Sequence, residues 1–142
     1  MKTSMRDWRA SARRLPLGSA HPVVERTFRQ AEIPAVRRLA AEFGTRAGIR
    51  ATRLADFVLA VNEAAACAVA GGPLTARLRM WTTGARAFCT VTGDSVLHLG
   101  PGDGRQGDVD ALRQWLLHQL CDYASVESGP DGVAVLLSVS VI

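Results

Sequence analysis

The sequence predicts an α+β fold: a two-layer sandwich in which a mixed or antiparallel sheet carries three helices on one face. Three observations predict it. Two segments in the first half of the chain have apolar residues at helical spacing, strand-like pairs of segments occur twice, and a further helical segment separates these pairs. A chain of 142 residues buries about two-thirds of the surface that it exposes when unfolded, so one core suffices for this architecture.

A strand over residues 23–29 is expected first, followed by two amphipathic helices. Pro34 suits the first turn of a helix, and apolar residues recur after it every three or four positions until Gly48. A second helix is expected from about Thr52 to Ala70, because Gly-Gly-Pro follows directly and stops it. The residues of this helix that we expect to face the core are Leu54, Phe57, Val58, Val61, Ala65, Ala68 and Val69.

Two hairpins are expected in the second half of the chain. Residues 74–81 alternate between apolar and polar side chains, which indicates a half-buried strand. A turn at Gly84 and Ala85 leads into its partner over residues 87–92. The last hairpin joins residues 123–128 to residues 133–141.

A loop and a third helix are expected between these hairpins. Residues 93–107 are rich in glycine and have no period, so we expect a long surface loop with a lid or binding role. Asp108 is expected to cap the helix that follows. Its apolar residues lie along one side, with Trp115 beside them: Val109, Leu112, Leu116 and Leu120.

The net positive charge is confined to the start of the chain. Residues 1–20 hold five basic side chains and one acidic, out of 17 and 13 in the whole chain. Residues 21–142 therefore hold twelve of each and sum to zero. We expect residues 1–20 to form a basic, disordered arm and residues 21–142 to form the folded domain.

The sequence lacks the features of secreted, membrane-spanning, disulfide-bonded and zinc-binding proteins. The first thirty residues contain no apolar segment of the length that a signal peptide needs, so we expect a cytoplasmic protein. The longest apolar stretch, residues 57–69, is too short to cross a bilayer and contains Asn62 and Glu63, so membrane insertion is not expected. The three cysteines are widely spaced and form no Cys-x-x-Cys pair, so neither a disulfide framework nor a zinc site is expected.

Several stretches together resemble one known superfamily. They are LAVNEAAACA at residues 59–68, FCTVTGDS at residues 88–95, the glycine-rich stretch, and WLLHQLCD at residues 115–122. Over residues 22–142 the chain resembles the Bergerat-fold (GHKL) histidine-kinase-like ATPases, and among them the small actinobacterial anti-sigma-factor serine kinases of the RsbW type. The resemblance implies the Bergerat fold, ATP and magnesium as cofactors, and a sigma factor or an anti-anti-sigma protein as partner.

The residues of this chain depart from the family at its nucleotide motifs. The family has a Glu that orients the attacking group and, four residues later, an Asn that helps to hold Mg²⁺. The matching residues here are Glu63 and Cys67, and a thiol is a poor substitute for an amide oxygen as a Mg²⁺ ligand. The family's adenine-binding Asp, followed two residues on by Gly, is matched by Gly93-Asp94-Ser95. Asp94 could take that role only after a shift of one residue along the strand.

The family's third motif, a Gly-x-Gly at the start of the last helix, is replaced by residues 111–115. Gly102 and Gly104 lie upstream, and with Arg105 or Arg113 they are the candidate phosphate site. For Glu63 two interpretations stay open: a catalytic base, or a carboxylate that is ion-paired with Arg53 or Arg113.

Three functions follow as alternatives. The first is a pseudokinase: an anti-sigma or partner-switching regulator that binds protein, with ATP and magnesium binding weakened or lost. It has Arg37, Arg38 and Glu42 as candidate contacts, and homodimerisation is plausible. The second is an active ATP-dependent Ser/Thr protein kinase that uses Glu63 as base and Asp94 for adenine. The third is a nucleic-acid or membrane-surface binder acting through residues 1–20; because the neutral domain has no base-reading motif, we do not expect nucleic acid as the partner.

Overall fold

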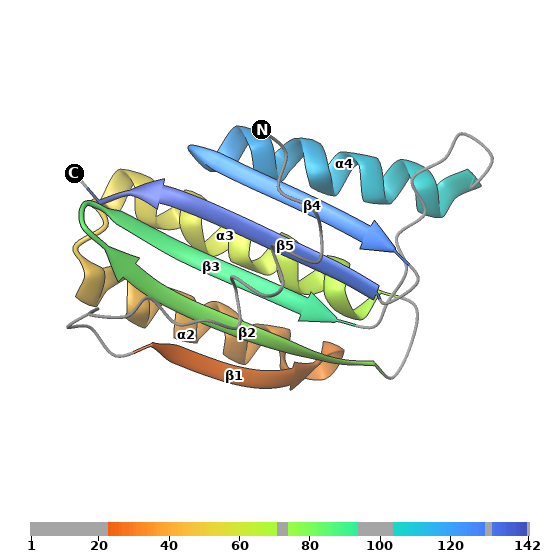
Figure 1. The fold of residues 1–142 in the computed structure, drawn as a ribbon, viewed down its shortest axis with the longest axis horizontal. Helices are drawn as coiled ribbons and strands as arrows, with labels where there is room; N and C mark the ends of the chain where they lie inside the picture. Colours follow the sequence, from red (N-terminus) through yellow and green to blue (C-terminus); the bar gives the residue numbers. More distant parts are fainter. Residues whose placement is uncertain (1–22, 71–73, 94–103, 130–131, 142) are drawn as a thin grey trace.

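The computed structural model describes residues 23–70, 74–93, 104–129 and 132–141. Its elements follow the predicted order (Figure 1). Predictions for the basic arm, Asp94 and Gly102 fall outside these residues and stay predictions. The elements are β1 Val24–Arg29, the short 3-10 helix η1 Gln30–Glu32, α2 Ile33–Ala47, α3 Ala51–Val69, β2 Thr75–Thr83, β3 Arg86–Gly93, α4 Gly104–Leu120, β4 Tyr123–Gly129 and β5 Gly132–Ser140.

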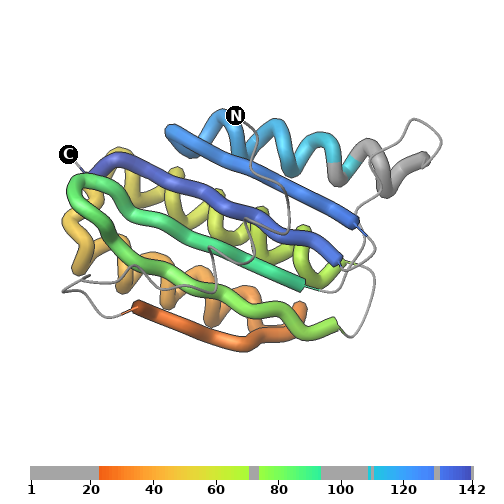
Figure 2. The backbone as a smooth tube through the Cα atoms, in the orientation of Figure 1, coloured from red at the N-terminus to blue at the C-terminus, as the bar shows by residue number. Residues whose placement is uncertain are grey.

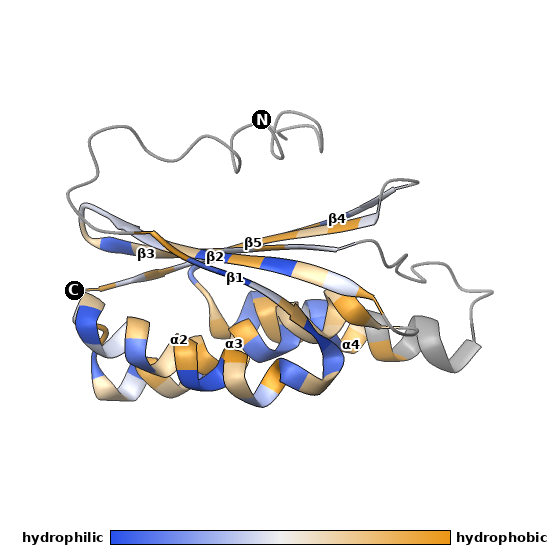
Figure 3. Ribbon diagram, turned by 90° about the horizontal axis from the view of Figure 1, so that it is seen from below, coloured by the Kyte–Doolittle hydropathy of each residue, from blue (hydrophilic) through white to orange (hydrophobic). Residues whose placement is uncertain are grey.

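The strands of the described residues form one sheet in the order β1-β2-β3-β5-β4. Every neighbouring pair in it is antiparallel, so the mixed sheet that the sequence left open does not occur there. The reason is the connectivity: β2-β3 and β4-β5 pair as consecutive antiparallel strands, and β5 then lies antiparallel to β3. Helices α2, α3 and α4 all lie against one face of the sheet, which gives an α+β arrangement in two layers (Figure 3).

The core lies between the sheet and α3, which runs behind β3 and β5 in Figure 2. Side chains on the helix-facing side of the sheet meet in register: Leu78 lies opposite Val91, and Val91 lies opposite Val135. All three are fully buried. The helix contributes mostly small side chains to this core, which allow a helix to approach a sheet closely. The buried residues of α3 are Phe57, Ala60, Val61, Ala64, Ala65, Cys67, Ala68 and Val69.

The ends of the first two helices lie within about two residues of those predicted from the sequence. Helix α2 has Pro34 in its first turn, and Gly48 follows its last residue with a φ of 86°, a left-handed conformation that glycine adopts without strain. Helix α3 begins and ends one residue before the predicted positions. No helix of the described ranges combines the length and apolar character that crossing a bilayer requires.

The predicted start of the third helix was wrong. Helix α4 begins at Gly104, so Gly104 and Arg105 lie in its first turn and not in a loop, and Asp108 is not its cap. The sequence did not predict this first turn because it contains two glycines, at positions 104 and 107. Glycine is about 1 kcal/mol less favourable than alanine in a helix. The apolar side was also misassigned: Leu117 is the fully buried residue of α4, whereas Val109 and Leu112 are exposed.

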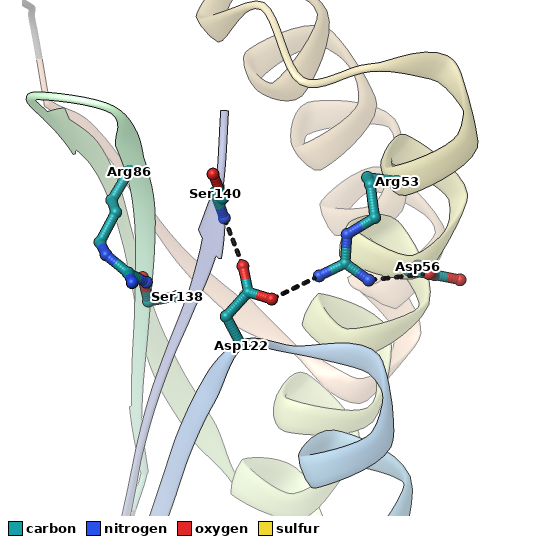
Figure 4. Close-up of polar contacts among 6 residues, drawn as sticks. All are labelled: Arg53, Asp56, Arg86, Asp122, Ser138 and Ser140. Carbon is teal, nitrogen blue, oxygen red and sulfur yellow. Dashed lines mark hydrogen bonds and ion pairs between the residues drawn. The ribbon is translucent and has the colours of Figure 1, made fainter. Parts of the chain in front are cut away.

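Asp122, directly after α4 and Cys121, joins three elements (Figure 4). Its Oδ2 accepts a hydrogen bond of 2.6 Å from the backbone N–H of Ser140 in β5. Its Oδ1 accepts one of 3.1 Å from Nη2 of Arg53, in the first turn of α3. Its own N–H donates to the carbonyl oxygen of Ser138 at 3.0 Å. A single carboxylate therefore fastens the start of α3 and the end of α4 to the last strand.

Replacing Asp122 by alanine is expected to lower the free energy of unfolding by about 2–3 kcal/mol, because two hydrogen bonds to a charged group are lost at once. Asp56 provides a matched control, since it accepts only one bond of 3.2 Å from the same Arg53. Asp56→Ala should cost about 0–1 kcal/mol, as exposed ion pairs do. Urea unfolding of both variants measures the difference, and equal losses would show that the Ser140 bond contributes nothing.

Candidate functional site

Glu63 lies on the side of α3 that faces α4, and its carboxylate is ion-paired. Nε of Arg113 in α4 lies 3.6 Å from Oε2 of Glu63, and the Glu63 side chain is only 18% exposed. The other arginine considered for this role, Arg53, pairs instead with Asp56 and Asp122. The contact is longer than a hydrogen bond, so it acts through charge attraction. Of the two interpretations of Glu63, the ion-paired carboxylate is therefore the one that the geometry of α3 and α4 matches.

Cys67 follows Glu63 by one helical turn and is fully buried in the core. Mg²⁺ requires oxygen ligands in a nearly octahedral arrangement, and a buried thiol offers none. Within the described ranges there is no group of three or more His, Cys, Asp or Glu side chains that could hold a metal ion. These residues do not fit the magnesium ion that the resemblance implies.

Asn62 does not replace the missing oxygen ligand. Its Oδ1 accepts a hydrogen bond of 2.9 Å from Nη1 of Arg37, which lies in α2. Asn62 thus reaches toward α2, whereas Glu63 reaches toward α4. The same bond engages Arg37, which the sequence suggested as a partner contact, in fastening α2 to α3.

Gly93, at the end of β3, occupies the position where the resembled family has its adenine-binding Asp. A Cβ atom placed there would lie too close to the carbonyl oxygen of Ala68 in α3 and would also crowd the Cβ of Ala68. Backbone atoms of a packed helix cannot move aside as a flexible side chain can. The position therefore excludes any side chain. Asp94 lies outside the described residues, as does Gly102, and the side chain of Arg105 is not described either.

Four large apolar side chains of α3 and α4 are exposed: Leu59 by 44%, Val109 by 41%, Leu112 by 57% and Trp115 by 57%. We name these four residues the α3–α4 apolar surface. On α4 they recur at helical spacing, on a side other than that of the buried Leu117. The sequence predicted Val109 and Leu112 on an apolar side of this helix with Trp115 beside them, but their spacing did not show that this side faces solvent.

Leu59 belongs to the same region as the α4 residues because of how the two helices run. Arg53 near the start of α3 pairs with Asp122 just after α4, and Glu63 pairs with Arg113 in the middle of α4. The helices are therefore antiparallel neighbours, as Figure 1 also shows. Leu59 precedes Glu63 by four residues, which places both on the same side of α3, the side that faces α4.

Comparison of the sequence with known proteins does not assign the chain to a family. No protein-family model matches the chain, and no curated protein matches it significantly.

Replacing Gly93 by alanine is expected to destabilise the fold by about 1–3 kcal/mol, the usual cost of forcing extra volume into a packed site. Gly93→Asp should cost more, because it also brings a charge against α3. Thr92→Ala is the matched control: Thr92 is the preceding residue, is partly exposed, and should change stability by no more than about 0.5 kcal/mol. Thermal unfolding measures all three, and a stable Gly93→Asp protein would contradict the steric argument.

The buried cysteines predict a loss of stability in alkali. Burial raises the pKa of the Cys121 thiol to about 12, and burial, with Cys121 nearby, raises the pKa of Cys89 well above its ordinary value. Both thiols ionise near pH 9 in the unfolded chain, which then binds fewer protons than the folded chain. Their stabilising contribution is thus complete below about pH 9 and is lost as the pH rises above that value, for Cys121 up to about pH 12. Each thiol lowers the free energy of unfolding by up to about 1.4 kcal/mol per pH unit in this range.

Urea unfolding at several pH values between 7 and about 10.5 checks this slope. Cys121→Ala should make the decline above pH 9 shallower, because one of the two titrating thiols is removed. A decline of the same steepness in the variant would assign the pH dependence to other groups.

Proposed function

We propose that this chain is a protein-binding regulator of the anti-sigma or partner-switching type, built on a histidine-kinase-like ATPase (Bergerat) fold whose nucleotide site has lost its catalytic chemistry. The observation that carries the proposal is the α3–α4 apolar surface. Apolar patches of this kind on otherwise polar proteins mark contacts with other proteins. Trp115 is the residue type that most often dominates the energy of such contacts.

The size of the surface supports a protein partner. A tryptophan side chain buries up to about 250 Å², so the exposed half of Trp115 together with the three aliphatic residues offers roughly 400 Å² of apolar area. A stable interface buries about 800 Å² on each partner. The surface therefore has the size of the apolar centre of an interface, around which polar contacts form the rim. Arg38 and Glu42 are exposed on α2, which lies on the other side of α3 from α4 (Figure 1), so they are candidates for the rim and not for this centre.

Three residues support the proposed loss of catalysis, because they occupy positions where the resembled family has nucleotide or metal contacts and the structure describes all three. Glu63 is paired with Arg113, Cys67 supplies a buried thiol where an oxygen ligand is needed, and Gly93 admits no side chain. Each change by itself weakens one contact with nucleotide or metal. Together they remove the metal ligand, the adenine contact and the free carboxylate, so an active kinase is not favoured.

The class of partner follows from the resemblance. Small kinases of the RsbW type hold a sigma factor or an anti-anti-sigma protein, and a relative without catalysis keeps the capacity to bind while losing the capacity to phosphorylate. We therefore expect a sigma factor or an anti-anti-sigma protein to cover the α3–α4 apolar surface. Binding there requires neither ATP nor magnesium.

The test uses purified sigma factors and anti-anti-sigma proteins of the same host, titrated into the full chain by calorimetry. One of them is expected to bind without nucleotide, and Trp115→Ala should weaken that binding by at least about 30-fold, the effect of removing an interface hot spot. Tyr123→Ala is the matched control, because Tyr123 is an aromatic residue of similar exposure, 52%, on β4. Its loss should leave affinity unchanged.

Two outcomes would contradict the proposal. If no protein of these classes binds, or if Tyr123→Ala weakens binding as much as Trp115→Ala, the α3–α4 apolar surface is not the contact. If the chain binds ATP with magnesium at micromolar concentration and phosphorylates its partner, and Glu63→Gln abolishes that transfer, the chain is a kinase.

A further inference from the structure

The outer face of the sheet is the face that points away from α2, α3 and α4, which all lie on the other side (Figure 3). Side chains alternate between the two faces along each strand, so the residues that flank the buried, helix-facing ones point to the outer face. The cross-strand register arranges them in rows across β2, β3, β5 and β4. These rows are Trp81-Phe88-Ser138-Tyr123, Arg79-Thr90-Leu136-Ser125 and Arg77-Thr92-Ala134-Glu127.

Large and small side chains complement each other about the midpoint of these rows. The midpoint lies between β3 and β5, because the four strands follow in the order β2-β3-β5-β4. In one row the bulky Phe88 lies on one side of it and the small Ser138 on the other. In the next row the bulky Leu136 lies beside the smaller Thr90. A two-fold axis along the strands at this midpoint exchanges β3 with β5, so it places each large residue over a small residue of a second copy.

The charges of the outer face follow the same symmetry. Arg77 on β2 and Glu127 on β4 lie at the two ends of one row. Three strand spacings of about 4.8 Å separate their backbones, about 14 Å in all, so the two side chains are too far apart to pair within one chain. In the part of the chain that the structure describes, neither takes part in an ion pair. The two-fold axis exchanges β2 with β4 and brings each of them over its opposite charge in the second copy.

The other arginines of the outer face meet no like charge in this arrangement. Arg79 pairs with Glu25 of β1 within its own chain, and the axis places it over Ser125 of the second copy. Arg86 lies one row further along β3, where the axis places it over Ser140. Repulsion between like charges is what most often prevents two surfaces from associating, and these rows avoid it.

We propose that two copies of this chain pack through the outer faces of their sheets, around a two-fold axis that runs along the strands between β3 and β5. Trp81 stacks on Phe88 in its own chain, with 5.5 Å between the ring centroids. In the dimer it lies against Tyr123 of the second copy, a residue that is 52% exposed in the single chain. Two sheets that pack in this way lie about 10 Å apart, a gap that the side chains of Arg77 and Glu127 together can bridge.

The size of the outer face fits a reversible dimer. Four strands make it about 19 Å wide, and the eight residues of β3 make it about 27 Å long, which gives a flat area of about 500 Å². The relief of the side chains adds to this area, so the face approaches the roughly 600 Å² per partner of the smallest stable interfaces. We therefore expect the fraction of dimer to depend on protein concentration.

The test is a charge reversal measured by sedimentation velocity of the full chain over a wide range of concentrations. The expected result for the unchanged chain is a monomer–dimer equilibrium. Arg77→Glu and Glu127→Arg should each raise the dissociation constant of the dimer at least about tenfold, because each places like charges together at both edges. The variant that carries both changes should recover most of the original affinity, since the pairs then form with reversed signs. Because the two residues cannot meet within one chain, this recovery reports contact between copies.

Two further variants keep the result interpretable. Arg38→Glu reverses a charge at an exposed position of α2 and is the matched control, which should leave the dissociation constant unchanged. Glu127→Gln repeats the test if circular dichroism shows that Glu127→Arg does not fold, and it should weaken the dimer less than a full reversal does. A chain that stays monomeric at every concentration would overturn the proposal, as would single reversals that the double change does not rescue.

The inference does not depend on the proposed function, because the α3–α4 apolar surface lies on the helix layer and the outer face lies on the opposite side of the sheet (Figure 3). Trp115→Ala should therefore weaken binding of a regulatory partner and leave the dimer intact. If Trp115→Ala abolishes the dimer instead, the copies associate through the α3–α4 apolar surface, and the outer face is not the interface.

Discussion

At the end of β3 the backbone of Gly93 lies against the carbonyl oxygen of Ala68, and no side chain fits between them. This close approach fixes how near α3 can lie to the sheet and which of its sides faces inward. The small residues Ala60, Ala64 and Ala68, all fully buried, make the approach possible along the whole helix. Once α3 is held in this way, the directions of all its polar side chains follow from the helical repeat.

The polar residues of α3 consequently form contacts with the neighbouring helix α2, with α4 and with a residue just after α4. Asn62 faces α2 and binds Arg37, and Glu63 faces α4 and pairs with Arg113. At the start of the helix, Arg53 holds Asp122 after α4. These three polar side chains of α3 join the helices to one another.

The sequence predicted the elements that depend on local pattern. Alternation predicted β2, and Pro34 with Gly48 predicted both ends of α2, because turn chemistry acts within a few residues. The sequence also limited the expected ion-pair partner of Glu63 to Arg53 or Arg113. The distance between residues along the chain does not determine which of the two arginines forms the pair. The contacts of Asp122 were missed, because they join residues 18 and 69 positions apart. Gly93 could have been recognised from the sequence, because a glycine inside a strand often marks a close approach of another backbone. It was interpreted instead as a substituted position of a nucleotide motif.

Helix α4 shows why a helix with two apolar sides is hard to orient from its sequence. Leu117 faces the core, while Leu112 and Trp115 face solvent, and both sides have helical spacing. Only packing against α3 and β4 decides which side is buried. The exposed side therefore remains available to a partner without any cost to the core.

The position of the Glu63–Arg113 ion pair beside this exposed side has a consequence for how a partner binds. Arg113 directly follows Leu112, so a protein that covers the α3–α4 apolar surface also removes water from the ion pair. Desolvating a pair of charges costs energy unless further hydrogen bonds satisfy the groups. A partner with a well-placed acceptor for the guanidinium recovers that cost, and a partner with a purely apolar surface does not. If the proposed function holds, Leu112 and Trp115 supply the apolar contact area, and the ion pair beside them adds a polar requirement that distinguishes one partner from another.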